Sequence, residues 1–179
     1  ARLGRVRRGP GARTGGVRPK ELDDPGGGVR TKDLTDPARA RGKALALLAR
    51  REYGVEELAR RLAAKGVDPA LAGEVVGALA QGGLASDRRF AESYARSRLD
   101  RGWGPLAIER DLRQRGLADG VIEETLAPLA GEWPERLEAV RAKRFGALPA
   151  DLRDRARQAR FLEYRGFPSE LVRAALRGP

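Results

Sequence analysis

The stretch Leu62-Ala63-Ala64-Lys65-Gly66-Val67 returns in kind as Leu112-Arg113-Gln114-Arg115-Gly116-Leu117 and again as Leu162-Glu163-Tyr164-Arg165-Gly166-Phe167, at intervals of fifty residues. In each copy a leucine faces inward and a cation lies near the end of a helix, where the helix dipole favours positive charge. A glycine then ends the helix, and the apolar residue after it can pack back. The equal spacing predicts three diverged copies of one helical unit.

Other helix boundaries support this interpretation. Asp36-Pro37, Asp68-Pro69 and Gly104-Pro105 each place a capping residue before a proline at the first helical position. Glycines 66, 82, 102, 116 and 166 follow apolar stretches and predict left-handed residues that end helices. The expected helices are 38–52, 55–65, 69–81, 87–101, 105–115, 119–128, 134–145, 150–165 and 169–177. We expect an all-α fold of three tandem three-helix repeats in an elongated, curved array.

The chain divides into four parts. Residues 1–36 are rich in Gly, Pro and Arg and lack apolar periodicity, so we expect a disordered basic arm. The predicted repeats cover 37–86, 87–131 and 132–179. Within the arm, residues 16–25 are echoed at 28–37, either as two copies of a docking motif or, as we favour, as a neutral duplication.

The composition argues against most catalytic classes. The chain has no cysteine, methionine or histidine, which removes thiolate nucleophiles, disulfides and the commonest zinc ligands. The carboxylate pairs Glu56-Glu57 and Glu123-Glu124 suit helix starts, and Gly26-Gly27-Gly28 lacks the context of a phosphate loop. We therefore expect no catalytic centre, no metal site and no cofactor.

Processing and location follow from the same sequence. Without an initiator methionine, the chain as given suggests trimming. No signal segment or long apolar run is visible, which predicts a cytosolic protein without a membrane contact.

The chain carries a formal net charge of +11, from 36 basic and 25 acidic residues. Such a field attracts polyanions or acidic protein surfaces. Between residues 88 and 115 there are eight arginines and four acidic residues, which makes this segment the leading candidate contact surface. The candidate cations, expected on exposed helix faces, are Arg50, Arg51, Lys65, Arg88, Arg89, Arg96, Arg98, Arg113 and Arg115. For each of them, an ordinary solvated helix face is the competing interpretation.

The aromatic residues divide into two groups. Phe90 and Tyr94 are four residues apart on one helix face and should pack in the core of the second unit. Tyr53 and Trp103 fall at predicted turns, where we expect them to be exposed and able to contact a partner or stack on an unpaired base.

Several motifs together resemble the RecX regulatory family. They are Leu48-Ala49-Arg50-Arg51-Glu52-Tyr53, Glu57-Leu58, Arg61-Leu62, Lys65-Gly66 and Asp87-Arg88-Arg89-Phe90-Ala91, followed by Tyr94, Arg98, Gly104-Pro105, Ile108, Leu112, Gly116 and Arg165-Gly166-Phe167. The resemblance covers roughly 38–177. The family usually has an acidic pair before the arginine and phenylalanine, whereas this chain has Ser86-Asp87.

The resemblance implies a bacterial regulator in recombination, DNA repair and the SOS response. Such a protein binds the RecA filament on single-stranded DNA, limits its extension or promotes its loss, and so lowers ATPase, strand-exchange and SOS co-protease activity. The expected partners are the RecA filament and, as a further candidate, single- or double-stranded DNA, with the protein acting as a monomer. The alternative is a basic helical DNA-binding protein that acts mainly through phosphate-backbone contacts.

Overall fold

The fold is taken from a computed structural model, which describes residues 35–177. The predicted basic arm, apart from its last two residues, and most of the echoed segments 16–25 and 28–37 lie outside the described residues. Within 35–177 the chain is helical and has no strand, as the sequence predicted.

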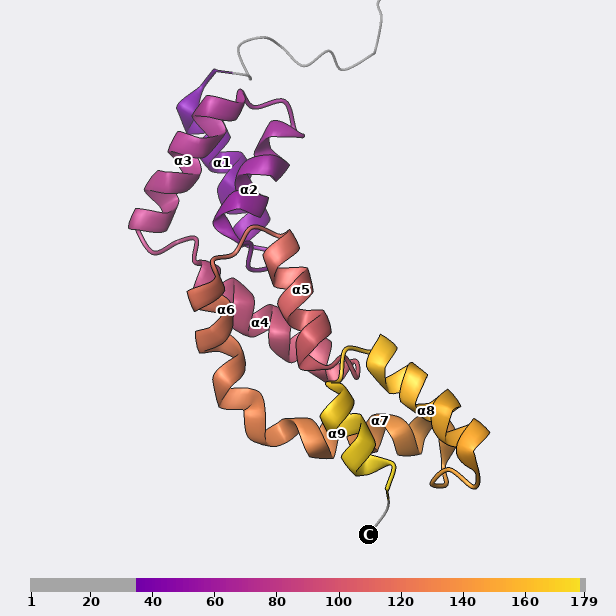
Figure 1. The fold of residues 1–179 in the computed structure, drawn as a ribbon. Coiled ribbons are helices and arrows are strands. Elements are labelled where there is room, and N and C mark those ends of the chain that lie inside the picture. The colour runs from indigo at the N-terminus through magenta and orange to yellow at the C-terminus, as the bar shows by residue number, and fades with distance from the viewer. Residues whose placement is uncertain (1–34, 178–179) are drawn as a thin grey trace, which may run out of the picture.

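Figure 1 shows the helices gathered in three groups along a bent, elongated path. The first group contains α1, α2 and α3, the second contains α4, α5 and α6, and the third contains α7, α8 and α9. Their bounds are α1 Pro37–Leu48, α2 Val55–Ala63, α3 Pro69–Gln81, α4 Asp87–Asp100, α5 Pro105–Gln114, α6 Asp119–Leu126, α7 Trp133–Phe145, α8 Leu152–Tyr164 and α9 Ser169–Ala175. A 3₁₀ helix, η2 (Ala127–Glu132), connects α6 to α7.

Two predicted Asp-Pro helix starts have side-chain caps. The Asp36 carboxylate accepts hydrogen bonds from the backbone N–H groups of Ala38 and Arg39, at 2.9 and 3.3 Å. The Asp68 carboxylate accepts in the same way from Ala70 and Leu71, at 3.0 and 3.1 Å. Each proline follows at the first helical position. A backbone N–H there has no intrahelical acceptor, so proline costs the helix no hydrogen bond.

The repeated glycine motif ends the second helix of each repeat in the same way. Gly66, Gly116 and Gly166 have φ of +81°, +92° and +87°. After each glycine, the next N–H donates back to the leucine carbonyl of the motif, at 3.1, 3.3 and 3.1 Å. These hydrogen bonds satisfy carbonyls that would otherwise lack a partner at the helix end. The left-handed backbone of the turn strongly favours glycine.

Several boundaries differ from the prediction, most of them by one or two residues. Gly82 has φ of −77°, and the left-handed residue is Gly83, at +71°. The first helix ends at Leu48 and not at residue 52, because the chain turns there to bury Tyr53 in the first core. Residues 127–132 continue as a 3₁₀ helix, since Pro128 lacks the N–H that an α-helix needs.

Each group of helices encloses its own core. The first includes Leu58, Leu62 and Val76, all fully buried. The second runs from Phe90 to Trp133, so the first residue of α7 packs into the core of the preceding repeat. The third is smaller and centres on buried residues of α7, α8 and α9. Burial of each large side chain contributes roughly 1.5–3 kcal/mol.

Candidate partner-binding surface

The candidate surface depends on how the repeats are joined, and both junctions follow one plan. In each, the turn that ends the second helix of one repeat lies against the start of the second helix of the preceding repeat. At the first junction Arg60 Nη2 donates to the carbonyl of Arg115 at 3.0 Å. At the second, the N–H of Gly104 donates to the carbonyl of Arg165 at 2.8 Å, and the N–H of Leu106 to that of Gly166 at 3.0 Å.

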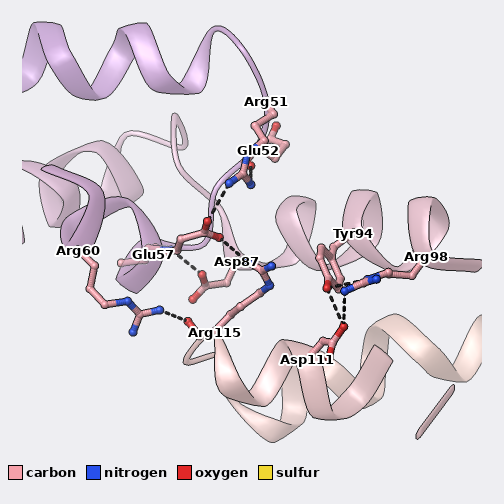
Figure 2. A network of polar contacts seen from close by, with 10 residues as sticks. Arg51, Glu52, Glu57, Arg60, Asp87, Tyr94, Arg98, Asp111 and Arg115 are labelled. Carbon is pink, nitrogen blue, oxygen red and sulfur yellow. Dashed lines mark hydrogen bonds and ion pairs between the residues drawn. The ribbon is translucent and has the colours of Figure 1, made fainter. Parts of the chain in front are cut away.

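The first junction is held by the carboxylate of Glu57, shown in Figure 2. Glu57 Oε1 accepts from Arg51 Nη2 at 2.8 Å, and its Oε2 accepts from Arg115 Nη1 at 3.0 Å. The Glu57 side chain is only 8% exposed, and the two arginines compensate its buried negative charge. Arg51 and Arg115, both candidate binding residues, are thus used inside the molecule.

Arg115 also contacts the aromatic side chains of α4. Its guanidinium lies 4.7 Å from the ring centroid of Tyr94. Burial opposes the charge, but the contacts with Tyr94 and Glu57 outweigh it and raise the pKa of Arg115 above its ordinary value. Arg115 therefore stays charged and remains part of the junction.

The Ser86-Asp87 departure from the family pattern has a structural role in this chain. Ser86 caps α4, with its hydroxyl oxygen accepting from the N–H of Arg89 at 3.3 Å. Asp87 Oδ1 accepts from the N–H of Val55 at 2.8 Å and so joins the second repeat to the first.

Arg89 is also part of this junction. Its Nε donates to Glu52 Oε1 at 3.0 Å. Its two terminal nitrogens donate to the carbonyls of Gly83 and Leu84, at 3.0 and 3.2 Å. Each of the three nitrogens of this guanidinium thus donates a hydrogen bond within the protein.

Arg98 is engaged in a polar triad inside the second repeat (Figure 2). Asp111 Oδ2 accepts from the Tyr94 hydroxyl at 2.9 Å and from Arg98 Nη2 at 2.7 Å. Arg98 Nε donates to the Tyr94 hydroxyl oxygen at 2.8 Å. The Tyr94 ring packs on the buried Phe90, with centroids 5.7 Å apart, which confirms the predicted core pair.

Tyr53 is not exposed, contrary to our expectation. It is 7% exposed, packs in the first core, and has the guanidinium of Arg51 at 3.7 Å from its ring centroid. The predicted turn is present, but the residue points inward because the first repeat gains apolar area by burying it. It therefore offers no free face for a base.

Trp103 is half-buried against the second core, so only part of its ring is accessible. Arg98 and Arg165 lie over it at 5.2 and 5.1 Å from the ring centroid. The largely exposed Tyr164 stands 6.3 Å away, centroid to centroid. Trp103 thus marks the meeting point of the second and third repeats.

Three candidate cations lie on open helix faces as predicted, with exposed or partly exposed acidic partners. Arg88 pairs with Glu92 at 3.1 Å, and Arg96 with Glu132 at 3.3 Å. Arg113 bonds Asp119 and Glu109, both at 2.7 Å, and the hydrogen bond to Asp119 is the main cause that raises its pKa. Exposed pairs of this kind contribute little stability, so an acidic partner can replace them at small cost.

Arg50 and Lys65 are exposed and lie in the turns after α1 and α2, not on helices as predicted. Neither side chain has an ion pair among residues 35–177. The Lys65 carbonyl accepts from Lys43 Nζ at 3.4 Å, and the Lys65 ammonium makes no hydrogen bond within the described residues.

The junction role of Glu57 was not predicted, and Arg101 and Lys143 were not among the predicted contact residues. Glu57 was interpreted as a residue suited to a helix start. The fifty-residue repeat offered a signal, because it aligns Arg51 with Arg101 and Arg115 with Arg165. Arg101 and Lys143 line a groove between the second and third repeats.

Residues 35–177 show neither a metal-binding cluster nor a membrane-spanning helix. No cluster of acidic side chains there is arranged to hold a metal ion. Within the same residues, no helix has the length and apolar character needed to cross a membrane.

The fold and its charged surface define a tandem helical repeat protein, and comparison with known proteins identifies its family. Models of the first, second and third three-helix domains of RecX match residues 40–79, 86–126 and 132–176. Together these matches cover most of the chain. The chain belongs to the RecX family, a family of regulatory proteins.

Similar proteins support the same assignment. A "Regulatory protein RecX" of Halorhodospira halophila is 52% identical over 136 residues, 75% of this chain and 84% of the relative. One of Pseudomonas savastanoi pv. phaseolicola is 42% identical over 139 residues, 77% of this chain and 90% of that relative. The crystal structure of RecX from Lactobacillus salivarius shares the fold, with a TM-score of 0.68 at 20% identity, over 79% of this chain and 94% of that one.

Proposed function

We propose that this chain binds the RecA filament on single-stranded DNA and lowers its ATPase, strand-exchange and SOS co-protease activity. It acts by limiting filament growth or promoting disassembly. The observation that carries the proposal is the set of three RecX domain matches in tandem. In this proposal the chain acts as a monomeric cytoplasmic regulator by binding, with no catalytic step of its own.

The shape of the molecule is compatible with such a partner. Three small repeats in a row form a long surface that can touch several subunits of a repeating filament at once (Figure 1). Weak contacts on one chain reinforce each other, because after the first contact the others form at high effective concentration. The net charge of +11 favours an acidic partner.

The contact residues we propose are cations that face solvent. Among the described residues, their side chains have no ion pair or pair only with exposed or partly exposed acids. They are Arg50, Lys65, Arg88, Arg96 and Arg113. We assign a structural role instead to Arg51, Arg89, Arg98 and Arg115, since each of them bonds inside a repeat or between repeats.

A second candidate function is binding to DNA through the phosphate backbone. The net charge supports it, because sequence-independent DNA binding arises from lysines and arginines that neutralise phosphates. This alternative predicts strong affinity for bare DNA that falls steeply with salt.

The test is single-stranded-DNA-dependent ATP hydrolysis by the cognate recombinase, titrated with this chain at moderate salt and excess DNA. We expect inhibition well below one protein per recombinase monomer. Absence of inhibition, despite binding to DNA alone, would contradict the proposal and favour the alternative.

A triple variant tests the surface. Arg88→Ala, Arg96→Ala and Arg113→Ala together should weaken inhibition about tenfold, as expected when several charged contacts are lost. The matched control replaces Arg153, Arg160 and Arg173 by alanine, which removes the same charge from exposed positions of the third repeat. Equal effects of the two triples would show that net charge matters and this surface does not.

A further inference from the structure

The two junctions place the same turn against the same helix start, but they differ in charge. At the first, Glu57 neutralises Arg51 and Arg115. Fifty residues on, the equivalent positions are Ala107, Arg101 and Arg165. The second junction therefore keeps both arginines and lacks the carboxylate that pairs with them in the first.

No internal acid replaces this carboxylate. Arg165 Nη1 donates to the carbonyl of Arg101 at 3.1 Å, and its guanidinium lies 5.3 Å from the ring centroid of Phe161. Neither arginine has an acidic partner in the part of the chain that the structure describes. The exposed Lys143 of α7 has no ion pair there either.

These cations border a groove of about 390 Å³ where α4, α7 and α8 meet. Five of its lining residues are basic and one is acidic: Arg101, Arg136, Lys143, Arg144, Arg165 and Asp100. Leu99, Val140 and Phe161 contribute its apolar lining. Such a groove favours a ligand with negative charge at its edges and an apolar group between them.

Resting on the function proposed above, we propose that this groove binds an acidic segment of the protein partner. The segment places one apolar side chain against Val140 and Phe161, and its carboxylates pair with Arg101, Lys143 and Arg165. It thus supplies from outside the carboxylate that Glu57 provides at the first junction.

The lining favours a peptide over a nucleic-acid strand. Single strands bind where aromatic faces are free to stack on bases. The only aromatic residue that lines the groove is Phe161, which is engaged edge-on with Phe145 at 5.4 Å between centroids. Arg144 and Arg165 also lie near its ring, at 6.0 and 5.3 Å from the centroid. An aliphatic side chain fits such a lining better than a base does.

The experiment measures the anisotropy of a fluorescein-labelled peptide with a leucine flanked on both sides by glutamates. The groove variant is Arg101→Glu with Lys143→Glu. The control, Arg41→Glu with Arg61→Glu, makes the same charge change at exposed positions of the first repeat. We expect the groove variant to raise the Kd about tenfold or more and the control to raise it less than about threefold. Circular dichroism checks that both variants stay helical.

Two further probes separate the alternatives. Replacing the leucine of the peptide by serine should weaken binding, whereas unchanged affinity would overturn the role of the apolar lining. Equal losses in the groove variant and its control would overturn the site. The third outcome concerns an oligothymidine. If it binds the wild type but not the groove variant, and the peptide binds neither, the groove is not a site for a protein segment.

The recombinase assay separates this inference from the proposed function. If the wild-type chain inhibits ATP hydrolysis and the groove variant inhibits equally well, the proposed function stands and the groove is overturned as its partner site. If the wild-type chain does not inhibit, the proposed function fails. In that case the peptide titration alone decides whether the groove binds acidic segments.

Discussion

Arg115 donates from Nη1 to Glu57 Oε2 at 3.0 Å and so joins two repeats through residues fifty-eight positions apart. The corresponding pair one repeat later would be Arg165 with residue 107, which is alanine. One junction is therefore closed by charge, and the other relies on backbone hydrogen bonds and apolar packing. Stability and binding should depend on the two junctions in different ways.

Replacing Glu57 by glutamine should destabilise the protein by about 1–2 kcal/mol, because two arginines lose a buried charged acceptor. Urea unfolding followed by circular dichroism measures the change. Glu92→Gln is the control, since Glu92 pairs with Arg88 on an exposed face and should matter by less than about 0.5 kcal/mol. Similar losses in the two variants would argue against the Glu57 ion pairs as the main link.

Replacing Gly166 by alanine should cost at least about 2 kcal/mol, through a left-handed backbone and a steric clash. Gly166 has φ of +87°, and an added Cβ would lie 2.4 Å from the Cβ and N of Ala107. The matched variant is Gly73→Ala in α3, where a Cβ meets nothing within 4 Å. It should stabilise by about 0.5–1 kcal/mol. Thermal unfolding of the two variants should therefore shift in opposite directions.

Arg88 and Arg89 are adjacent but should differ in their effect on stability. Arg89→Ala removes bonds to Glu52 and to two loop carbonyls, which should cost about 1 kcal/mol or more. Arg88→Ala removes only an exposed pair with Glu92 and should change stability by less than about 0.5 kcal/mol. Equal unfolding midpoints in urea would contradict this division between a structural and a surface arginine.

Glu138 should contribute to the acid sensitivity of the third repeat. Its hydrogen bonds to the buried Arg141 lower the pKa of the Glu138 carboxyl below its ordinary value. A folded-state pKa below the unfolded one gives stability that is present above the unfolded pKa and is lost as pH falls through the folded pKa.

The measurement is the urea midpoint of wild type and Glu138→Gln from neutral pH down to about pH 3. The wild type should be more stable near neutrality, and the difference should shrink as the carboxyl becomes protonated. Glu124→Gln, an exposed change in α6, should follow the wild type throughout. A difference between wild type and Glu138→Gln that stays constant with pH would contradict the ion-pair origin.

The helices and their repetition could be predicted from local sequence signals. Asp36 and Asp68 cap helices through bonds to backbone groups two and three residues away, and Gly66, Gly116 and Gly166 end helices within one turn. Such signals act over a few residues and can be read locally. They located the second and third helices of the first repeat to within two residues.

Which arginines are available to a partner depends on the tertiary structure. Arg51, Arg89, Arg98 and Arg115 look like Arg88 and Arg96 in the sequence, but their acidic partners come from another helix or from another repeat. Tyr53 is buried for the same kind of reason, since core contacts around the turn decide its orientation. Long-range packing sets these pairings, and local spacing does not encode it.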